Sequence, residues 1–73
     1  MIKLIFDSEY YEIFITRRNI LVRNKLNNNH CHFSNLTDAI KFVRLMEKNI
    51  VPWSKYWKEC KKRLEEGDID DKT

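Results

Sequence analysis

Two histidines and two cysteines are the residue types in this chain best suited to metal binding. His30, Cys31 and His32 are consecutive, and Cys60 follows much later. Zinc binds histidine and cysteine, and a structural zinc site uses four ligands. On a strand, however, His30 and His32 point to one side and Cys31 to the other, so at most three of the four side chains converge. The spacing favours partly exposed histidines and free thiols. We expect no metal and no cofactor, with a Cys31–Cys60 disulfide as the alternative for the cysteines.

The same residues do not form a catalytic pattern. A cysteine nucleophile with a histidine base needs a group that orients the base and donors that stabilise an oxyanion. The chain has one glycine and contains neither a Ser-x-Gly elbow nor a phosphate-binding loop. Asp7 and Glu9 are more simply turn residues than a general acid and base. We therefore expect a binding protein and not an enzyme.

A cluster of positive charge is the strongest candidate for a binding site. Four basic side chains fall within nine residues, on strands and turns that helices need not cover: Arg17, Arg18, Arg23 and Lys25. Basic residues on a sheet can contact phosphates and read guanine edges in the major groove of DNA. Tyr10 and Phe14 would add contacts to sugars or methyl groups. The alternative is a solvated hairpin.

Two further surfaces are candidates. Lys55, Lys58 and Lys62 form a secondary basic face on a predicted helix. An aromatic group follows Pro52 and consists of Trp53, Tyr56 and Trp57. If exposed, this group would mark a protein interface, because tryptophan and tyrosine are enriched at interface hot spots. The alternative is that these rings pack in the core.

The hydrophobic pattern predicts the elements that position these residues. Four segments rich in aromatic and β-branched residues predict strands over about 1–6, 10–16, 20–26 and 30–33. In the first, Ile2, Leu4 and Phe6 should share one face. Asn27-Asn28-Asn29 predicts a loop, because asparagine tolerates a left-handed backbone.

Two helices should follow the strands. Apolar residues recur every three or four positions after Asn35, a favourable N-cap, and predict a helix over about 36–49. A second apolar stripe, Trp53, Trp57, Cys60 and Leu64, predicts a helix over about 52–66 that starts at Pro52. The expected fold class is therefore α+β: an antiparallel sheet of three or four strands (about 1–33), then two helices packed on one face.

Length and charge limit the partners. The 73 residues predict a single domain over 1–66 and an acidic, flexible tail over 67–73. The net charge of +3 divides into +7 over residues 1–64 and −4 over 65–73. A basic body favours nucleic acid, a nucleoprotein complex or an acidic protein as partner. No apolar run approaches the roughly 20 residues that span a bilayer, and unpaired cysteines favour a reducing cytoplasm. We expect a cytoplasmic protein without a membrane partner.

The junction between the strands and the first helix resembles a known family. Three strands followed by Phe33-Ser34-Asn35-Leu36-Thr37-Asp38-Ala39, with Phe42 after it, resemble the small DNA-binding domains at the N-terminus of tyrosine recombinases and the related AP2-like domains. The similarity covers about residues 10–47. It implies a sheet that lies in the major groove, with Arg17, Arg18, Arg23 and Lys25 on the DNA. This chain departs from the family by having Asn27-Asn28-Asn29 where glycines and a basic run are usual.

A second resemblance rests on composition. Asparagine-rich loops, abundant lysine and isoleucine and a short chain are similar to the accessory proteins of phages and mobile elements, including anti-CRISPR inhibitors. The leading hypothesis is nucleic-acid binding. The alternative is an inhibitor that binds a host or defence protein complex, such as a CRISPR nuclease. A homodimer through the uncovered sheet face or a strand edge is compatible with both.

Overall fold

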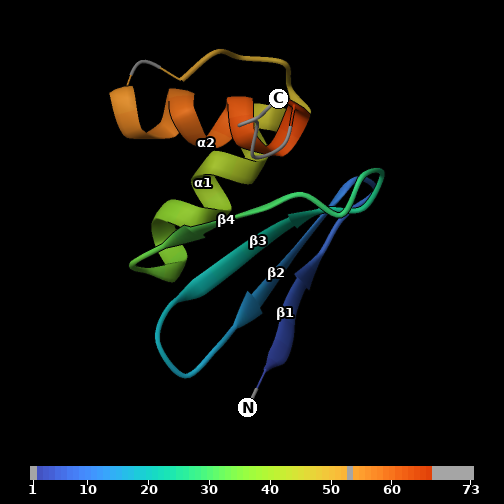
Figure 1. Cartoon of the computed structure of the whole chain (residues 1–73), viewed down its shortest axis with the longest axis vertical. Helices are drawn as coiled ribbons and strands as arrows, with labels where there is room; N and C mark the ends of the chain where they lie inside the picture. The colour runs from blue at the N-terminus through green and yellow to red at the C-terminus, as the bar shows by residue number, and fades with distance from the viewer. Residues whose placement is uncertain (1, 53, 67–73) are drawn as a thin grey trace, which may run out of the picture.

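The computed structural model describes residues 2–52 and 54–66, which form one sheet followed by two helices (Figure 1). Four antiparallel strands lie in the order β1-β2-β3-β4. Their bounds are β1 Lys3–Asp7, β2 Tyr11–Ile15, β3 Ile20–Asn24 and β4 His30–Phe33, and the helices are α1 Leu36–Glu47 and α2 Lys55–Glu66. The predicted α+β fold is confirmed. Neither of the described helices is long and apolar enough to cross a membrane. The predicted tail over 67–73 lies outside the described residues.

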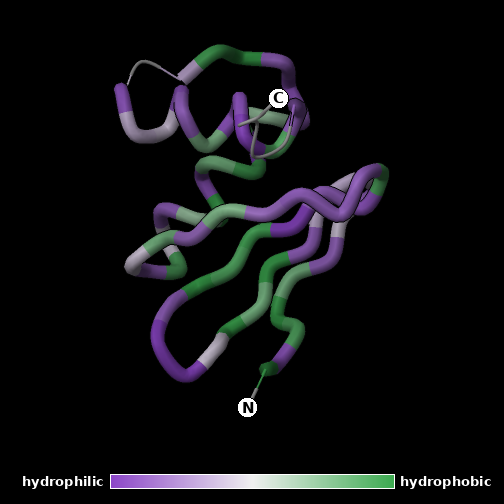
Figure 2. The backbone as a smooth tube through the Cα atoms, viewed as in Figure 1, coloured by the Kyte–Doolittle hydropathy of each residue, from purple (hydrophilic) through white to green (hydrophobic). Residues whose placement is uncertain are grey.

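One face of the sheet is buried against the helices. In β2, β3 and β4 the buried residues alternate with more exposed ones, as period-two strands require. Ile13, Val22 and Cys31 are cross-strand neighbours on the buried face and are almost inaccessible to solvent. Figure 2 shows hydrophobic residues concentrated in the strands and hydrophilic ones in the turns. The opposite face, called the open face below, has no helix packed on it in the described chain.

The first strand contains an irregularity that the alternating pattern did not reveal. Leu4 pairs with Phe14, but Phe6 pairs with Ile13, so the register shifts by one residue at Ile5. Because Phe14 and Ile13 face opposite sides of β2, Leu4 and Phe6 do as well. The prediction that Leu4 and Phe6 share a face was therefore wrong. Leu4 lies on the open face and is 45% exposed, whereas Phe6 packs against the core.

The ends of α1 follow local rules. Asn35 is the N-cap, and its side-chain oxygen accepts a hydrogen bond from the Asp38 backbone N–H at 2.9 Å. At the other end Asn49 has a left-handed backbone, with φ of 59°. The Ile50 N–H donates to the Leu45 carbonyl oxygen at 3.0 Å, which is a Schellman ending. The helix thus ends at Glu47, two residues before the predicted end.

The start of α2 also differs from the prediction. Ser54 accepts the first helical hydrogen bond, from the Lys58 N–H at 2.9 Å, so the helix begins at Lys55 and not at Pro52. Pro52 is instead fully buried. Proline has no backbone N–H that would need an acceptor, so its ring can be buried in the core ahead of the helix.

Three asparagine amides hold the C-terminal end of α2 against the loop between β3 and β4. The Nδ2 atoms of Asn24, Asn27 and Asn29 all donate to the carbonyl oxygen of Leu64, at 3.0, 3.0 and 3.3 Å. That carbonyl belongs to the last turn of α2, where carbonyl oxygens generally take donors from outside the helix. We call these three residues the asparagine clamp. The clamp fixes where the last turn of α2, and with it Arg63, lies relative to the sheet.

Candidate functional site

The four predicted nucleic-acid-binding residues do not form one patch. Arg17 and Arg18 are exposed in the turn between β2 and β3, at one end of the sheet. Thr16 shapes this turn, because its hydroxyl oxygen accepts hydrogen bonds from the backbone N–H groups of Arg18 at 3.2 Å and Asn19 at 3.1 Å. The two guanidinium groups therefore extend from a well-defined turn.

Arg23 lies on the open face and is neutralised there. Its Nε donates to Glu12 Oε1 at 2.8 Å, and its terminal nitrogens contact the same carboxylate and the side-chain oxygen of Asn28. Cross-strand pairing of Glu12 with Arg23 brings the two groups together. The charge of Arg23 is therefore already paired with a carboxylate within the sheet.

Lys25 is neutralised in the same way, near the end of the sheet opposite Arg17. It forms an ion pair with Asp7, and its Nζ donates to the Ser8 carbonyl oxygen at 2.7 Å. Sequence reasoning treated Asp7 as a turn residue. The antiparallel register instead sets this carboxylate beside a lysine from a distant segment.

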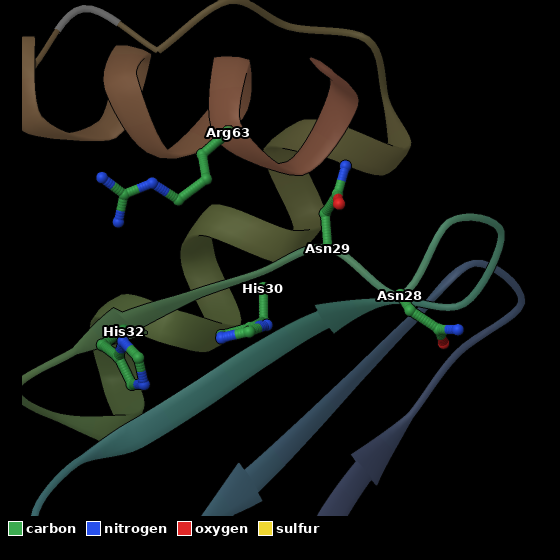
Figure 3. A pocket seen from close by; sticks show the side chains of 5 residues that line it. All are labelled: Asn28, Asn29, His30, His32 and Arg63. Atoms are coloured by element: carbon green, nitrogen blue, oxygen red, sulfur yellow. The ribbon is translucent and has the colours of Figure 1, made fainter. Parts of the chain in front are cut away.

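A different set of cations gathers beside β4. His30 and His32 project from the open face, and Arg63 extends toward them from α2 (Figure 3). These side chains, with Asn28 and Asn29, line a hollow of about 230 Å³. The two imidazole rings meet edge to face with centroids 5.6 Å apart. Polar donors therefore surround this hollow, and none of the carboxylates in residues 2–52 and 54–66 lines it.

A second hollow adjoins the first and shares its histidines. It has a volume of about 600 Å³ and is lined by Ile2, Thr16, Arg17, Arg18, Asn19, Leu21, His30 and His32. His30 and His32 thus connect the turn arginines to Arg63 along β4. We call the set Arg17, Arg18, His30, His32 and Arg63 the cationic strip.

No carboxylate in the described part of the chain forms an ion pair with the cationic strip. Within residues 2–52 and 54–66 the ion pairs are Arg23–Glu12, Lys25–Asp7 and Lys61–Glu65, and none includes a member of the strip. Burial lowers the pKa of His32, and the positive charges of His30 and Arg63 lower it further. A bound anion would oppose that repulsion and favour the protonated imidazole.

The sequence pattern predicted Arg17 and Arg18 as nucleic-acid contacts but did not single out Arg63. In the sequence Arg63 follows two lysines on a helix and looks like part of a solvated face. It had left His30 and His32 without a task. Only the packing of α2 beside β4 brings Arg63 over the two histidines.

The candidate protein interface divides between surface and core. Trp53 lies outside the described residues. Tyr56 is 52% exposed, and its hydroxyl donates to the His32 carbonyl oxygen. Trp57 is partly buried, with its ring edge-on to those of Phe33 and Phe42 at 5.9 Å between centroids. Trp57 is therefore part of the packed core. The secondary basic face of Lys55, Lys58 and Lys62 is exposed on α2.

The cysteines lie on the other side of β4 from the histidines. Cys31 and Cys60 are both buried free thiols in the core. Their side chains hydrogen-bond to each other, which raises the pKa of Cys31 and lowers the pKa of Cys60 to about 7. No group of three or more histidine, cysteine or acidic side chains is arranged for a metal ion among the described residues.

Comparison with family models, curated proteins and solved structures found no match for this chain. The resemblances to recombinase DNA-binding domains and to phage inhibitors therefore stay predictions.

Proposed function

We propose that this chain is a non-enzymatic protein that binds nucleic acid through the cationic strip. One observation carries the proposal: five cationic or protonatable side chains surround two adjoining hollows, and no described carboxylate pairs with them. Phosphate groups match this chemistry, because arginine donates charge-assisted hydrogen bonds to them in a bidentate geometry.

The number of fixed charges predicts the salt dependence. Arg17, Arg18 and Arg63 are charged at all working pH values, so about three phosphates should be neutralised at neutral pH. Each neutralised phosphate releases counterions, which gives a slope of log K against log salt of about −0.7 per phosphate for single strands and −0.9 for duplex DNA. We expect a total slope of about −2 to −3.

The test is fluorescence anisotropy with labelled nucleic acids at two salt concentrations. The Arg17→Ala, Arg18→Ala double variant should bind at least about tenfold more weakly, since one charge-assisted hydrogen bond contributes about 1.5–3 kcal/mol. The matched control is Lys41→Ala with Arg44→Ala, which removes two exposed charges from α1, the helix on the other face of the sheet. Equal losses of affinity in both double variants would mean that binding depends only on net charge and not on the cationic strip. No binding at low salt would overturn the proposal.

A protein-binding inhibitor of phage or mobile-element origin is the second candidate. Exposed apolar side chains favour it: Ile50 and Val51 precede α2 and are 46% and 64% exposed. Val51 lines a hollow of about 310 Å³ with Lys58 and Lys62 of the secondary basic face, and Lys61, Glu65 and Glu66 complete its lining, so lysines outnumber the acids there. Apolar groups beside lysines suit an acidic protein surface, such as that of a CRISPR nuclease. Purified nuclease should then be inhibited by the wild type and by the Arg17→Ala, Arg18→Ala variant, but less by Val51→Asp.

A further inference from the structure

A row of apolar and aromatic side chains crosses the open face beside the cationic strip. Leu4 pairs with Phe14, Phe14 with Leu21 and Leu21 with His32, so all four project from the same side of neighbouring strands. Leu4 and His32 are exposed, and Phe14 and Leu21 are half-buried. We call these four residues the stacking row. Its His32 end is shared with the cationic strip, so the two features form one surface.

The spacing of the two rings suits separated bases. Phe14 and His32 are on β2 and β4, with one strand between them, so they lie about 10 Å apart at roughly 4.8 Å per strand. Stacked nucleotides in one strand of B-DNA rise only about 3.4 Å. Bases that have left a stack can each lie against an aromatic ring, whereas the base faces of a duplex are covered by their neighbours.

The charges on the open face disfavour a duplex across the sheet. The carboxylates of Glu12 and Asp7 lie on this face, where they hold Arg23 and Lys25. A sheet inserted in the major groove would bring β1 and β2 to the phosphates and therefore bring these acids with them. A single strand whose phosphates run along β4 instead meets the cationic strip, and only its bases extend across the sheet to the stacking row.

We propose that this surface binds single-stranded nucleic acid, with bases against Phe14 and His32 and phosphates along Arg17, Arg18 and Arg63. The proposal rests on the proposed function and narrows its substrate class. It departs from the duplex reading that the recombinase resemblance implies. Positive charge beside the stacking row that no described carboxylate neutralises is the argument for a polyanion with exposed bases.

The experiment compares three probes on the full chain: a labelled oligothymidine, a labelled oligouridine and a duplex of the same length. Single strands should bind at least about tenfold more tightly than the duplex at equal salt, since one base–aromatic stack contributes about one to three kcal/mol. Phe14→Leu keeps an apolar side chain and removes the ring, and it should weaken single-strand binding about fivefold or more. Phe14→Tyr keeps the ring and should bind single strands as the wild type does. Leu26→Ala, at a 77% exposed residue outside the row, is the matched control.

The outcomes separate the inference from the proposed function. Equal or tighter duplex binding would overturn the single-strand inference and leave nucleic-acid binding standing. Unchanged affinity in folded Phe14→Leu would also overturn it, because the ring would then take no part. Absence of binding to all three probes at low salt would remove the proposed function and the inference together. Oligothymidine and oligouridine further decide whether DNA or RNA is preferred.

Discussion

The Nδ2 of Asn24 donates a hydrogen bond to the carbonyl oxygen of Leu64 at 3.0 Å, and this contact joins β3 to the last turn of α2. Asn24 is only 6% exposed, and its Oδ1 accepts from the Leu26 N–H at 2.9 Å. Both the Nδ2 and the Oδ1 of Asn24 therefore have hydrogen-bond partners within the protein. Arg63 precedes Leu64, so this bond also helps to set the height of Arg63 above the histidines.

Replacing Asn24 by alanine should destabilise the fold and weaken binding. The variant leaves the Leu26 N–H without its side-chain acceptor and takes one of three donors from the Leu64 carbonyl oxygen. Loss of a buried hydrogen-bonding group costs about 1–3 kcal/mol. Urea unfolding monitored by circular dichroism would measure the free energy of unfolding.

Asn29→Ala is the matched control for that variant. Its amide donates to the same Leu64 oxygen at 3.3 Å, but the other two clamp residues remain. We expect a loss below about 1 kcal/mol, in the range of a typical net hydrogen bond. A loss in Asn29→Ala that equals the loss in Asn24→Ala would mean that burial of the Asn24 amide is unimportant.

The asparagine loop illustrates how much of this fold local sequence can predict. A run of three asparagines indicates a loop because the residue tolerates a left-handed backbone, and Asn28 has φ of 64°. The partners of the asparagine amides, by contrast, cannot be predicted from this run of residues. Asn27 contacts Leu64, a residue 37 positions away, and no local pattern contains that contact.

The same limit applies to the charges at the candidate site. Arg23 and Lys25 looked like free cations because the acids that neutralise them come from other strands, and only the register of the sheet brings them together. Period-two alternation also assumes a regular strand, so it could not reveal the bulge at Ile5. Arg17 and Arg18 lie on a single turn, and no ion pair with a distant described residue changes their charge.

Arg17→Gln and Arg23→Gln should have opposite consequences. Each substitution removes one positive charge. Arg17 has no ion-pair partner in the described part of the chain, so Arg17→Gln should weaken nucleic-acid binding with little change in stability. Arg23→Gln strands the Glu12 carboxylate, whose side chain is 16% exposed, and should destabilise the fold by about 1 kcal/mol.

Thermal melting and anisotropy on the same two preparations would measure this difference. Both proteins carry the same net charge, so a difference in affinity reports position and not total charge. If Arg23→Gln lost more affinity than Arg17→Gln while staying folded, the predicted contact would lie across the sheet and not along the cationic strip.

Binding should strengthen as the pH falls from 7.5 to 5.5. His32 lies beside His30 on β4 and Arg63 on α2. In the larger hollow it also lies near the turn arginines, Arg17 and Arg18. Each of these neighbours carries either a positive charge or no charge. Its pKa is lowered, first by burial and then by His30 and Arg63, so the free protein resists protonating it. Phosphates in the strip would favour the imidazolium, and binding should take up protons.

The same shift predicts a change in stability of the opposite sign. Because the folded chain holds the His32 proton less well than the unfolded chain, the free protein should lose stability as the pH falls through about 6.5. His32→Gln should flatten both the affinity profile and the stability profile. An affinity that does not depend on pH between 5.5 and 7.5 would exclude the imidazoles from the contact.

The buried thiol pair predicts one unusually acidic cysteine. The hydrogen bond from Cys31 is the largest cause of the lowered pKa of Cys60, about 7, and burial opposes it. The thiolate absorbance of the folded protein, followed from pH 6 to 9, should therefore rise with a midpoint below that of an ordinary cysteine. Removing Cys31 in Cys31→Ala should move this midpoint upward. Cys31 and Cys60 are at most 4% exposed, so alkylation of either thiol should be slow in the folded protein and fast in urea. The same midpoint in Cys31→Ala and in the wild type would show that the Cys31 thiol does not lower the pKa of Cys60. An intact mass lower by two hydrogens would instead reveal a disulfide.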